Sequence, residues 1–412
     1  MRKPHMHRAW MILGSSSITL FIAYAIRIGA FSVLLPEMIQ EFQLTKAEGG
    51  MIKTSMMFTY TLFSPLVGWL TDRIGGRFVI CFFCLFLGAG TFLMGKTSGL
   101  LTAVLFFGIV GIGAAGLWTP VVTLVQRWFG ESRRGLALGI LSPSYVLGFG
   151  LMGLILPIIV KQYGWRIGWF ILGICGFGLV PLNAAFLRSR PEEMGIVPWA
   201  ESLKESKAAA SADQPLGYSK IFTKQVFWLI GFAYLLIASG TYIILDFIVT
   251  YGVMELKIHY TVASGLISVV GFSSVFGGFI LLTLSDYIGR KKSLVIIQTW
   301  LGCGILLTIF VGNRITLMMV GMGIFGFLYG AIWPMYGATA RDYFPKEMTG
   351  TIIGLWTIFY GVGAMICPVV AGYLADVTGT FRWPFGLAAL TCFIAALLVG
   401  FLRKPTKFDR QP

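Results

Sequence analysis

The chain has 412 residues, of which 57% are hydrophobic and only 12% charged, and its mean hydropathy is +0.82. A soluble domain carries about 25% charged and about 45–50% apolar residues, so this composition excludes a soluble enzyme, a secreted disulfide-stabilised domain and a disordered protein. A net charge of +15 would suit a nucleic-acid partner, but we expect none, because no soluble domain is available to carry a basic binding face.

Long apolar segments follow one another along the whole chain. Each has about 20 residues or more, enough to cross about 30 Å of hydrocarbon, whereas the strands of an outer-membrane barrel are ~10-residue alternating segments. The sequence therefore predicts an all-α polytopic membrane protein with twelve transmembrane helices, at residues 10–35, 48–70, 79–95, 101–126, 135–160, 168–187, 226–252, 261–284, 293–312, 315–340, 350–373 and 383–402.

Lysine and arginine are unevenly distributed among the segments that join these helices. Segments on the side of the N-terminus contain 23 of them, and segments on the opposite side contain eight. Positively charged segments stay in the cytoplasm, so we expect a multi-pass protein of the cell (inner) membrane with both termini cytoplasmic.

One connecting segment, residues 188–225, is longer and more polar than the others and is typical of a flexible cytoplasmic linker. It separates six helices from six, which predicts an N-terminal bundle at residues 1–187 and a C-terminal bundle at residues 226–412. Trp118 and Trp333, one on each side, are 215 residues apart. Two pseudo-symmetric halves with a cleft between them are typical of transporters built from parallel repeats.

A motif recurs after helix 2 and helix 8. The first copy reads Gly68-Trp-Leu-Thr-Asp72-Arg73-Ile-Gly-Gly-Arg77, and the second contains Asp286 and Arg290. The first copy resembles the best-known loop of the major facilitator superfamily, Gly-x-Leu-x-Asp-Arg-x-Gly-x-Arg, and the second departs from it at Leu282 and Tyr287. The resemblance covers nearly the whole chain and implies two bundles with alternating access. It also implies that the charged residues of both copies gate the cytoplasmic side and do not touch substrate; these are Asp72, Arg73, Arg77, Asp286 and Arg290.

Three strings have the spacing Gly-x-Gly-x-x-Gly, at residues 111–116, 148–153 and 321–326. A dinucleotide site requires a preceding strand, whereas each string lies within a predicted membrane helix, where glycine allows close packing. We expect no cofactor and no metal.

Arg27 lies nine residues before Pro36, which is expected to end helix 1. An arginine near the centre of a membrane helix costs about 2.5–3.5 kcal/mol on insertion scales, so it usually faces a cavity or a partner. Its planar donors fit a carboxylate or a phosphate, and Tyr24 lies on the same helical face. We expect both residues to bind an anionic substrate; alternatively, Arg27 pairs with an internal acid.

That acid is Asp246, in helix 7. A shift of 215 places Arg27 on Tyr242, one turn before Asp246. A carboxylate inside the membrane can take up and release protons, so we hypothesise that Asp246 couples proton movement to anion binding at Arg27. A permanent Arg27–Asp246 ion pair is the alternative. Lys53, near the start of helix 2, is interpreted as a residue that extends its charge to the membrane surface; a second contact to the anion is the alternative.

Aromatic side chains are expected to contribute hydroxyl groups and π-faces to the substrate site. Beside Tyr24 and Tyr242, the candidates are Tyr60, Tyr145 and Trp333. For each of them, a purely structural packing role is the alternative.

The segment from Ile22 to Glu48 is similar to the start of the anion:cation symporters, the branch of sialic-acid and sugar-acid carriers. In that branch the matching arginine binds the substrate carboxylate, which implies this role for Arg27. The chain departs from the branch at Ile26, where an acid is frequent, and in helix 4, which lacks an acid. Residues 127–140 look like the helix 4–5 junction of monocarboxylate transporters and oxalate–formate exchangers.

We therefore predict a secondary active transporter of a small organic anion, a mono- or dicarboxylate, with proton symport, acting as a monomer in the lipid bilayer. The alternatives are an organic-anion exchanger of the oxalate–formate type, or a transporter of drugs or other solutes in which Arg27 and Asp246 form a structural pair. A membrane enzyme is disfavoured, because no catalytic triad or nucleotide site is found.

Overall fold

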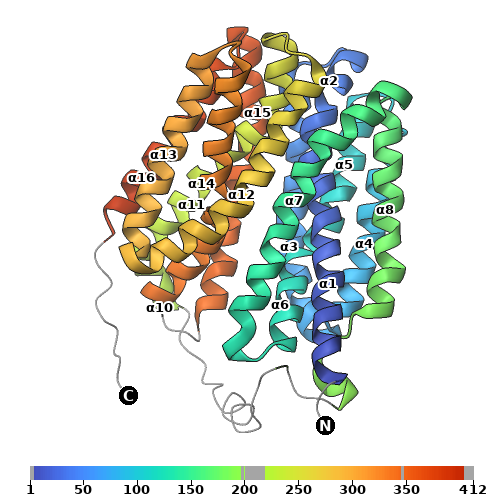
Figure 1. The fold of residues 1–412 in the computed structure, drawn as a ribbon, viewed down its shortest axis with the longest axis vertical. Helices are drawn as coiled ribbons and strands as arrows, with labels where there is room; N and C mark the ends of the chain where they lie inside the picture. Colours follow the sequence, from blue (N-terminus) through green and yellow to red (C-terminus); the bar gives the residue numbers. More distant parts are fainter. Residues whose placement is uncertain (1–3, 196–198, 200–218, 345–347, 403–412) are drawn as a thin grey trace. The chain divides into compact units, whose positions relative to one another are not determined.

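A computed structural model of the chain describes residues 4–195, 199, 219–344 and 348–402. These residues are almost entirely helical (Figure 1). The first half comprises α1 (Pro4–Tyr24), the π-helix η1 (Ala25–Ala30), α2 (Phe31–Phe42), α3 (Lys46–Ile74), α4 (Gly76–Met94), α5 (Leu100–Ala115), α6 (Trp118–Trp128), α7 (Glu131–Tyr163), α8 (Trp165–Phe186) and the short 3₁₀-helix η2 (Pro191–Met194). The second half comprises α10 (Ser219–Phe222), α11 (Gln225–Thr250), the π-helix η3 (Tyr251–Glu255), α12 (Tyr260–Ile288), α13 (Arg290–Val311), α14 (Ile315–Tyr343), α15 (Thr349–Thr378) and α16 (Arg382–Gly400).

These helices form the twelve predicted spans. Eleven helical segments of the described residues are long and apolar enough to cross a membrane, with α1, η1 and α2 forming one segment and α5 and α6 another. The twelfth span is α3, which is equally long but less apolar because Ser, Thr and Tyr residues interrupt its hydrophobic sequence. The predicted linker falls largely on residues 196–198 and 200–218, which lie outside the described residues.

The chain divides into two compact units. One comprises Met1–Phe31 with Ser55–Pro215, and the other comprises Ser32–Thr54 with Leu216–Pro412. The segment 32–54, which is α2 and the first turns of α3, thus packs with the helices of the second half. The predicted bundle boundaries at residues 187 and 226 remain a prediction.

The two units repeat the same packing. In the first unit α1 packs against α7 and α8, and α4 packs against α5 and α8; in the second, α11 packs against α15 and α16, and α13 packs against α14 and α16 (Figure 1). Each of these pairs is related to its counterpart by the 215-residue repeat. The predicted pseudo-symmetry is therefore present in the fold.

The recurring motif does not form a loop, contrary to the sequence interpretation. Asp72 lies in the last turn of α3 and Asp286 in the last turn of α12. A single glycine joins each of these helices to the next, Gly75 with φ +88° and Gly289 with φ +93°. Only glycine adopts such a backbone without strain, so the chain turns sharply at the same place in both repeats.

Helix 1 does not end at Pro36. The proline lies inside α2, which continues to Phe42. Proline is tolerated inside a membrane helix because local irregularities and neighbouring helices compensate for the lost backbone hydrogen bond. The preceding turn is a π-helix, Ala25–Ala30, and contains Arg27.

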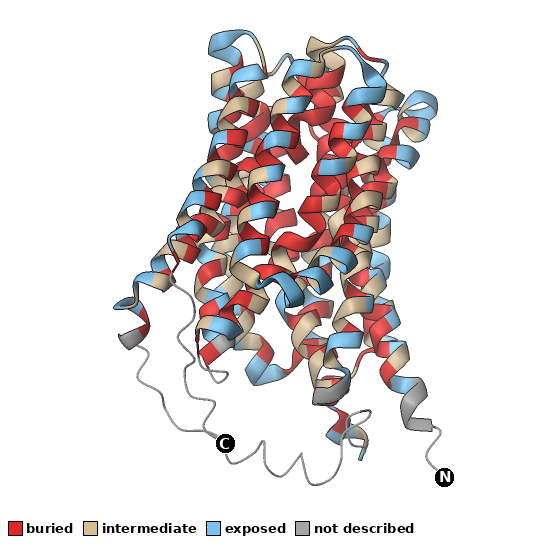
Figure 2. Ribbon diagram, turned by 60° about the vertical axis from the view of Figure 1, so that its left-hand side comes forward, coloured by how far each residue is buried: buried red, intermediate tan, exposed pale blue. Residues whose placement is uncertain are grey.

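Glycines hold helices close together inside each unit. A Cβ added to Gly111 would lie 2.1 Å from the carbonyl oxygen of Met56, and one added to Gly326 would lie 2.2 Å from the Ser273 hydroxyl. These glycines are 215 residues apart and belong to two of the Gly-x-Gly-x-x-Gly strings, which confirms packing as their role. Buried residues follow one side of the helices, while large apolar side chains remain exposed on another side (Figure 2), as a lipid environment requires.

Candidate functional site

Arg27 is buried in the middle of the first membrane-spanning segment. Its residue is only 1% exposed, and it lies in the π-helical turn η1. The guanidinium carbon lies 4.8 Å from the ring centroid of Tyr24 and 4.7 Å from that of Tyr60, and Nη2 lies 3.8 Å from the sulfur of Met57. Two aromatic faces stabilise the cation, and π-helical turns are frequent at functional sites because they change the direction of a side chain.

The predicted aromatic residues of the first unit contact this arginine or lie next to a residue that contacts it. The Tyr24 ring lies 5.0 Å from Tyr145 on α7 and 6.1 Å from Trp118 on α6. Trp118 and Tyr145 also contact each other edge to face, at 5.7 Å. Arg27, Tyr24, Tyr60 and Tyr145 thus come from three different spans to one place, and their binding of substrate remains a prediction.

Asp246 is fully buried on α11 and forms an ion pair with Lys53. The distance from Lys53 Nζ to Asp246 Oδ1 is 2.9 Å, and neither side chain is exposed. The Lys53 ammonium also lies 5.5 Å from the ring centroid of Tyr242. The interpretation that Lys53 reaches the membrane surface was wrong. Because α3 begins at Lys46, residue 53 lies two turns inside the helix, too deep for its charge to reach water.

The other predicted residues of the second unit, Tyr242 and Trp333, form a tyrosine–tryptophan cluster with Tyr360 next to this ion pair. The hydroxyl groups of Tyr242 and Tyr360 are 2.5 Å apart, and the Tyr360 ring lies edge to face with Trp333 at 4.5 Å. Tyr145 and Tyr360 are 215 residues apart, as are Trp118 and Trp333. The edge-to-face contact of tryptophan and tyrosine is therefore repeated in both units, at equivalent positions.

The predicted gating residues lie at the helix ends and are more exposed than the buried charges. Asp72 Oδ1 lies 3.3 Å from Arg127 Nη2, and Asp286 pairs with Arg290. Arg73 lies over the Trp69 ring, and Arg77 donates to the Ala184 carbonyl at 2.5 Å. Each of these charged residues thus has a neighbouring partner. Their gating role remains a prediction.

The family follows from the sequence comparison. The family model described as Major Facilitator Superfamily matches residues 16–286 and 255–412, which is nearly the whole chain. The chain belongs to the Major Facilitator Superfamily. It is accordingly a multi-pass membrane transporter and not an enzyme.

Two curated relatives are named as transporters of sulfoacetate and of galactarate or D-glucarate. The "Probable sulfoacetate transporter SauU" of Cupriavidus necator is 26% identical over 431 residues, covering 97% of this chain and 95% of the relative. The "Probable galactarate/D-glucarate transporter GarP" of Escherichia coli K12 is 24% identical, covering 97% and 96%.

A solved structure shares the fold. A bacterial homologue of the human lysosomal transporter Spinster, in an inward-facing and occupied conformation, matches with a TM-score of 0.74 over 97% of both chains. At 15% sequence identity, this match shows a shared fold and nothing more.

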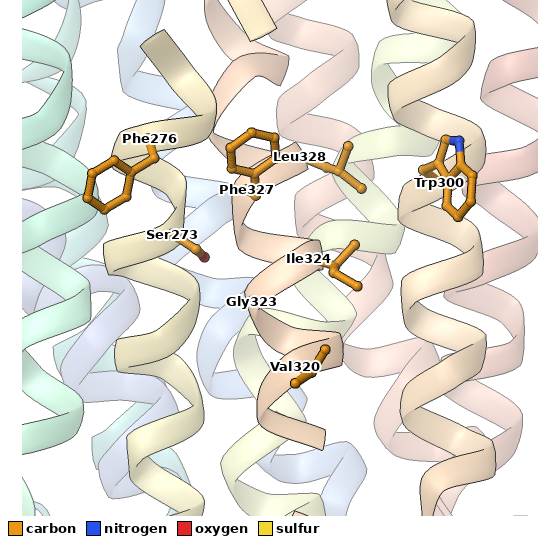
Figure 3. Close-up of a pocket in the computed structure, with 8 residues that line it drawn as sticks. All are labelled: Ser273, Phe276, Trp300, Val320, Gly323, Ile324, Phe327 and Leu328. Carbon is orange, nitrogen blue, oxygen red and sulfur yellow. The ribbon is translucent and has the colours of Figure 1, made fainter. Parts of the chain in front are cut away.

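A groove of about 400 Å³ opens on α12, α13 and α14 of this superfamily member (Figure 3). Its lining is apolar apart from Ser273, whose hydroxyl donates to the carbonyls of Val269 and Val270. Phe276 and Trp300 at this groove are 63% and 59% exposed. A groove without a charged group does not suit an anion, and exposed rings on membrane helices suit contact with lipid.

Proposed function

We propose that this transporter is a proton-coupled symporter of a small organic anion whose carboxylate binds Arg27. The observation that carries the proposal is the buried guanidinium in a π-helical turn between the Tyr24 and Tyr60 rings. The relatives support the substrate class, because sulfoacetate and glucarate are organic anions.

The physical argument begins with the cost of this arginine. A buried guanidinium is retained in a membrane helix only where its charge is compensated. The Tyr24 and Tyr60 rings contribute to this compensation, and a cation–π contact contributes about 0.5–2 kcal/mol. A carboxylate held by two parallel N–H groups contributes more and fixes the orientation of the ligand. Arg27 is therefore suited to bind the charged end of an organic acid.

Asp246 is the candidate for proton coupling. Lys53 stabilises the ionised carboxylate of Asp246 in this conformation. When a proton neutralises this carboxylate, the attraction between the two side chains is lost. A proton bound to Asp246 therefore makes the charge of the second unit more positive by one. A carrier needs such a chemical difference between its loaded and empty forms in order to couple two solutes.

The experiment that tests the proposal is binding and transport with purified protein. We expect carboxylates, sugar acids or sulfonates to raise the apparent melting temperature, and one of them to enter proteoliposomes faster when a proton gradient is imposed. Arg27→Gln should weaken the binding of that anion by about tenfold to 100-fold, since a hydrogen bond to a charged group contributes about 1.5–3 kcal/mol.

The matched control is Arg166→Gln. Arg166 lies in the same unit, donates to the Thr97 carbonyl at 3.3 Å and lies 4.4 Å from the Trp165 ring centroid. We expect this variant to bind the anion like the wild type. Stabilisation by cations or neutral drugs alone, or equal binding by Arg27→Gln, would contradict the anion proposal.

Exchange is separated from symport by counterflow. An obligate exchanger takes up labelled anion only when unlabelled anion is inside the vesicle, whereas the proposed symporter responds to the proton gradient in vesicles without internal anion.

The charge distribution favours cytoplasmic termini in the inner membrane. Protease protection of a C-terminal tag would check this orientation.

A further inference from the structure

The apolar groove on α12, α13 and α14 consists of residues of the second unit alone. α14 packs against both other helices, and Gly323, which has no side chain, lines the groove on α14 together with Phe276 on α12 and Trp300 on α13 (Figure 3). The volume of about 400 Å³ is within the range of about 300–1,000 Å³ for ligand pockets. The Ser273 hydroxyl is already hydrogen-bonded to a carbonyl, so the lining suits a hydrocarbon chain.

An exposed stripe on α13 joins this groove to the start of the helix. Lys292, Ile296 and Trp300 are all exposed and follow one another at intervals of four residues, which places them on one face of the helix. The helical rise puts Lys292 about 12 Å from Trp300 along the axis. One leaflet is about 15 Å of hydrocarbon, half of the about 30 Å of a bilayer core. An acyl chain whose headgroup lies at Lys292 is therefore long enough to reach the groove.

The start of α13 carries three consecutive cations, Arg290, Lys291 and Lys292. Arg290 pairs with Asp286 and lies near a second acid on α14, so acids compensate its charge. Lys291 donates to the Leu402 carbonyl, which is a neutral group, and Lys292 is exposed. Within the part of the chain that the structure describes, neither lysine has an acidic partner. The positive charge at this helix end therefore comes mainly from the two lysines.

We propose that this surface binds an anionic phospholipid, whose phosphate contacts Lys291 and Lys292 while one acyl chain follows the α13 stripe into the groove. Basic residues near the cytoplasmic surface attract anionic headgroups, and the charge distribution favours the cytoplasmic side for this helix end. The occupant is a lipid and not a soluble phosphate, because only a lipid brings a phosphate and a hydrocarbon chain together. The inference is independent of the proposed substrate and of Arg27.

The equivalent surface of the first unit lacks these features. The 215-residue repeat relates the two rings at the groove to Leu85 and Thr61, and it relates Lys292 to Arg77. The Arg77 guanidinium donates to the Ala184 carbonyl. We therefore expect one such lipid site in each chain and not two.

The test measures lipid binding to purified, delipidated protein by native mass spectrometry. Phosphatidylglycerol and phosphatidylcholine with the same acyl chains are compared at increasing concentrations. We expect one phosphatidylglycerol to bind about tenfold or more tightly than phosphatidylcholine, since each lysine contributes about fivefold. This preference should shrink as the salt concentration rises, because salt screens exposed charges. Inorganic phosphate at the same concentration as the lipid should not displace it.

Two variants test the headgroup and the chain separately. The double variant Lys291→Gln with Lys292→Gln should lose the preference for phosphatidylglycerol and bind phosphatidylcholine like the wild type. Lys292→Gln alone, at an exposed side chain, should lose about fivefold. Gly323→Leu fills the groove and should weaken the binding of both lipids several-fold. A Cβ at Gly323 would lie 3.6 Å from Val269, an ordinary contact, so this variant is expected to fold.

Each variant has a matched control in the first unit. Arg190→Gln removes an exposed cation on the predicted cytoplasmic side, and Gly178→Leu adds the same side chain to α8, where a Cβ would have nothing within 4 Å. Both controls should bind the lipids like the wild type. Equal affinity of the wild type for both lipids, an unchanged preference in the double lysine variant, or wild-type binding by Gly323→Leu would overturn the proposal. An equal loss in either control would also overturn it, because the lipid would then not be bound at this surface.

Discussion

The carboxylate of Asp376 on α15 accepts the backbone N–H of Lys46 at 3.0 Å. Its second oxygen accepts the N–H of Ala47 at 2.8 Å, so an acid from another helix caps the N-terminus of α3. Thr45 and Glu48 add a reciprocal pair of hydrogen bonds at the same end, at 2.7 and 3.1 Å. Backbone N–H groups in the first turn of a helix have no partner within the helix, and these side chains supply acceptors for them at α3.

We expect Asp376→Ala to destabilise the protein by about 1 kcal/mol, within the range of about 0.5–2 kcal/mol for lost N-caps. Asp376→Asn keeps one acceptor oxygen and should cost less. Thermal unfolding in detergent, followed by intrinsic fluorescence, measures both. The control is Glu193→Ala at an exposed acid of η2, which should leave the melting temperature unchanged. Equal melting temperatures of Asp376→Ala and the control would show that the cap contributes nothing.

The repeat-related glycines lead to a second prediction. Gly111→Ala would place Cβ 2.1 Å from the Met56 carbonyl oxygen, and Gly326→Ala would place it 2.4 Å from the Val270 carbonyl oxygen. Backbone atoms cannot move aside cheaply, so we expect each variant to lose about 1–3 kcal/mol of stability. The measurement is the apparent melting temperature together with the monodisperse fraction in size-exclusion chromatography.

Gly139→Ala on α7 is the matched control for these two variants. A Cβ at Gly139 would have nothing within 4 Å, and alanine favours a helix by up to about 1 kcal/mol over glycine. This variant should melt at the same or a higher temperature. If Gly139→Ala lost as much stability as Gly111→Ala, close packing would not be the reason for the effect.

The Tyr60 ring supports the Arg27 guanidinium from α3, at 4.7 Å. Tyr60→Phe keeps the aromatic face and should bind the anion with nearly wild-type affinity. Tyr60→Leu removes a cation–π contact of about 0.5–2 kcal/mol, so we expect a loss of affinity of about twofold to 30-fold. Ligand-induced thermal stabilisation measures both variants, and equal loss in Tyr60→Phe would point to the hydroxyl group instead of the ring.

Hydropathy and the 215-residue repeat allowed the helix ends to be predicted within five residues, except for the first helix, which covers residues 4–42 and not 10–35. Most helices were predicted too short. The polar turns that extend α1, α3 or α12 beyond their apolar part have no hydrophobic signal. Pro36 was expected to end a helix, and the π-helical turn before it was not anticipated. Both depend on how neighbouring segments satisfy the backbone, which a single sequence does not display.

The ion pair was missed for a related reason. Lys53 and Asp246 are 193 residues apart, and no local pattern connects them. One local signal was available: Thr45 and Glu48 have the spacing of a capping box, which predicts that α3 begins at residue 46. That start places Lys53 two turns inside the helix and would have excluded a surface role.

The Asp72–Arg127 contact separates stability from gating in a final prediction. Asp72 is 76% exposed and Arg127 30% exposed at their side chains, with 3.3 Å between Oδ1 and Nη2. An exposed ion pair contributes about 0–1 kcal/mol, so Asp72→Asn and Arg127→Gln should melt close to the wild type. If the motif gates the cycle, both variants should bind the anion with unchanged affinity and transport it several-fold more slowly, because only the exchange between conformations is altered.

Two measurements distinguish these effects: anion binding, followed by thermal shift, and the initial rate of uptake into proteoliposomes. Unchanged uptake by both variants would remove this contact from the gate, and weakened binding would place it near the substrate.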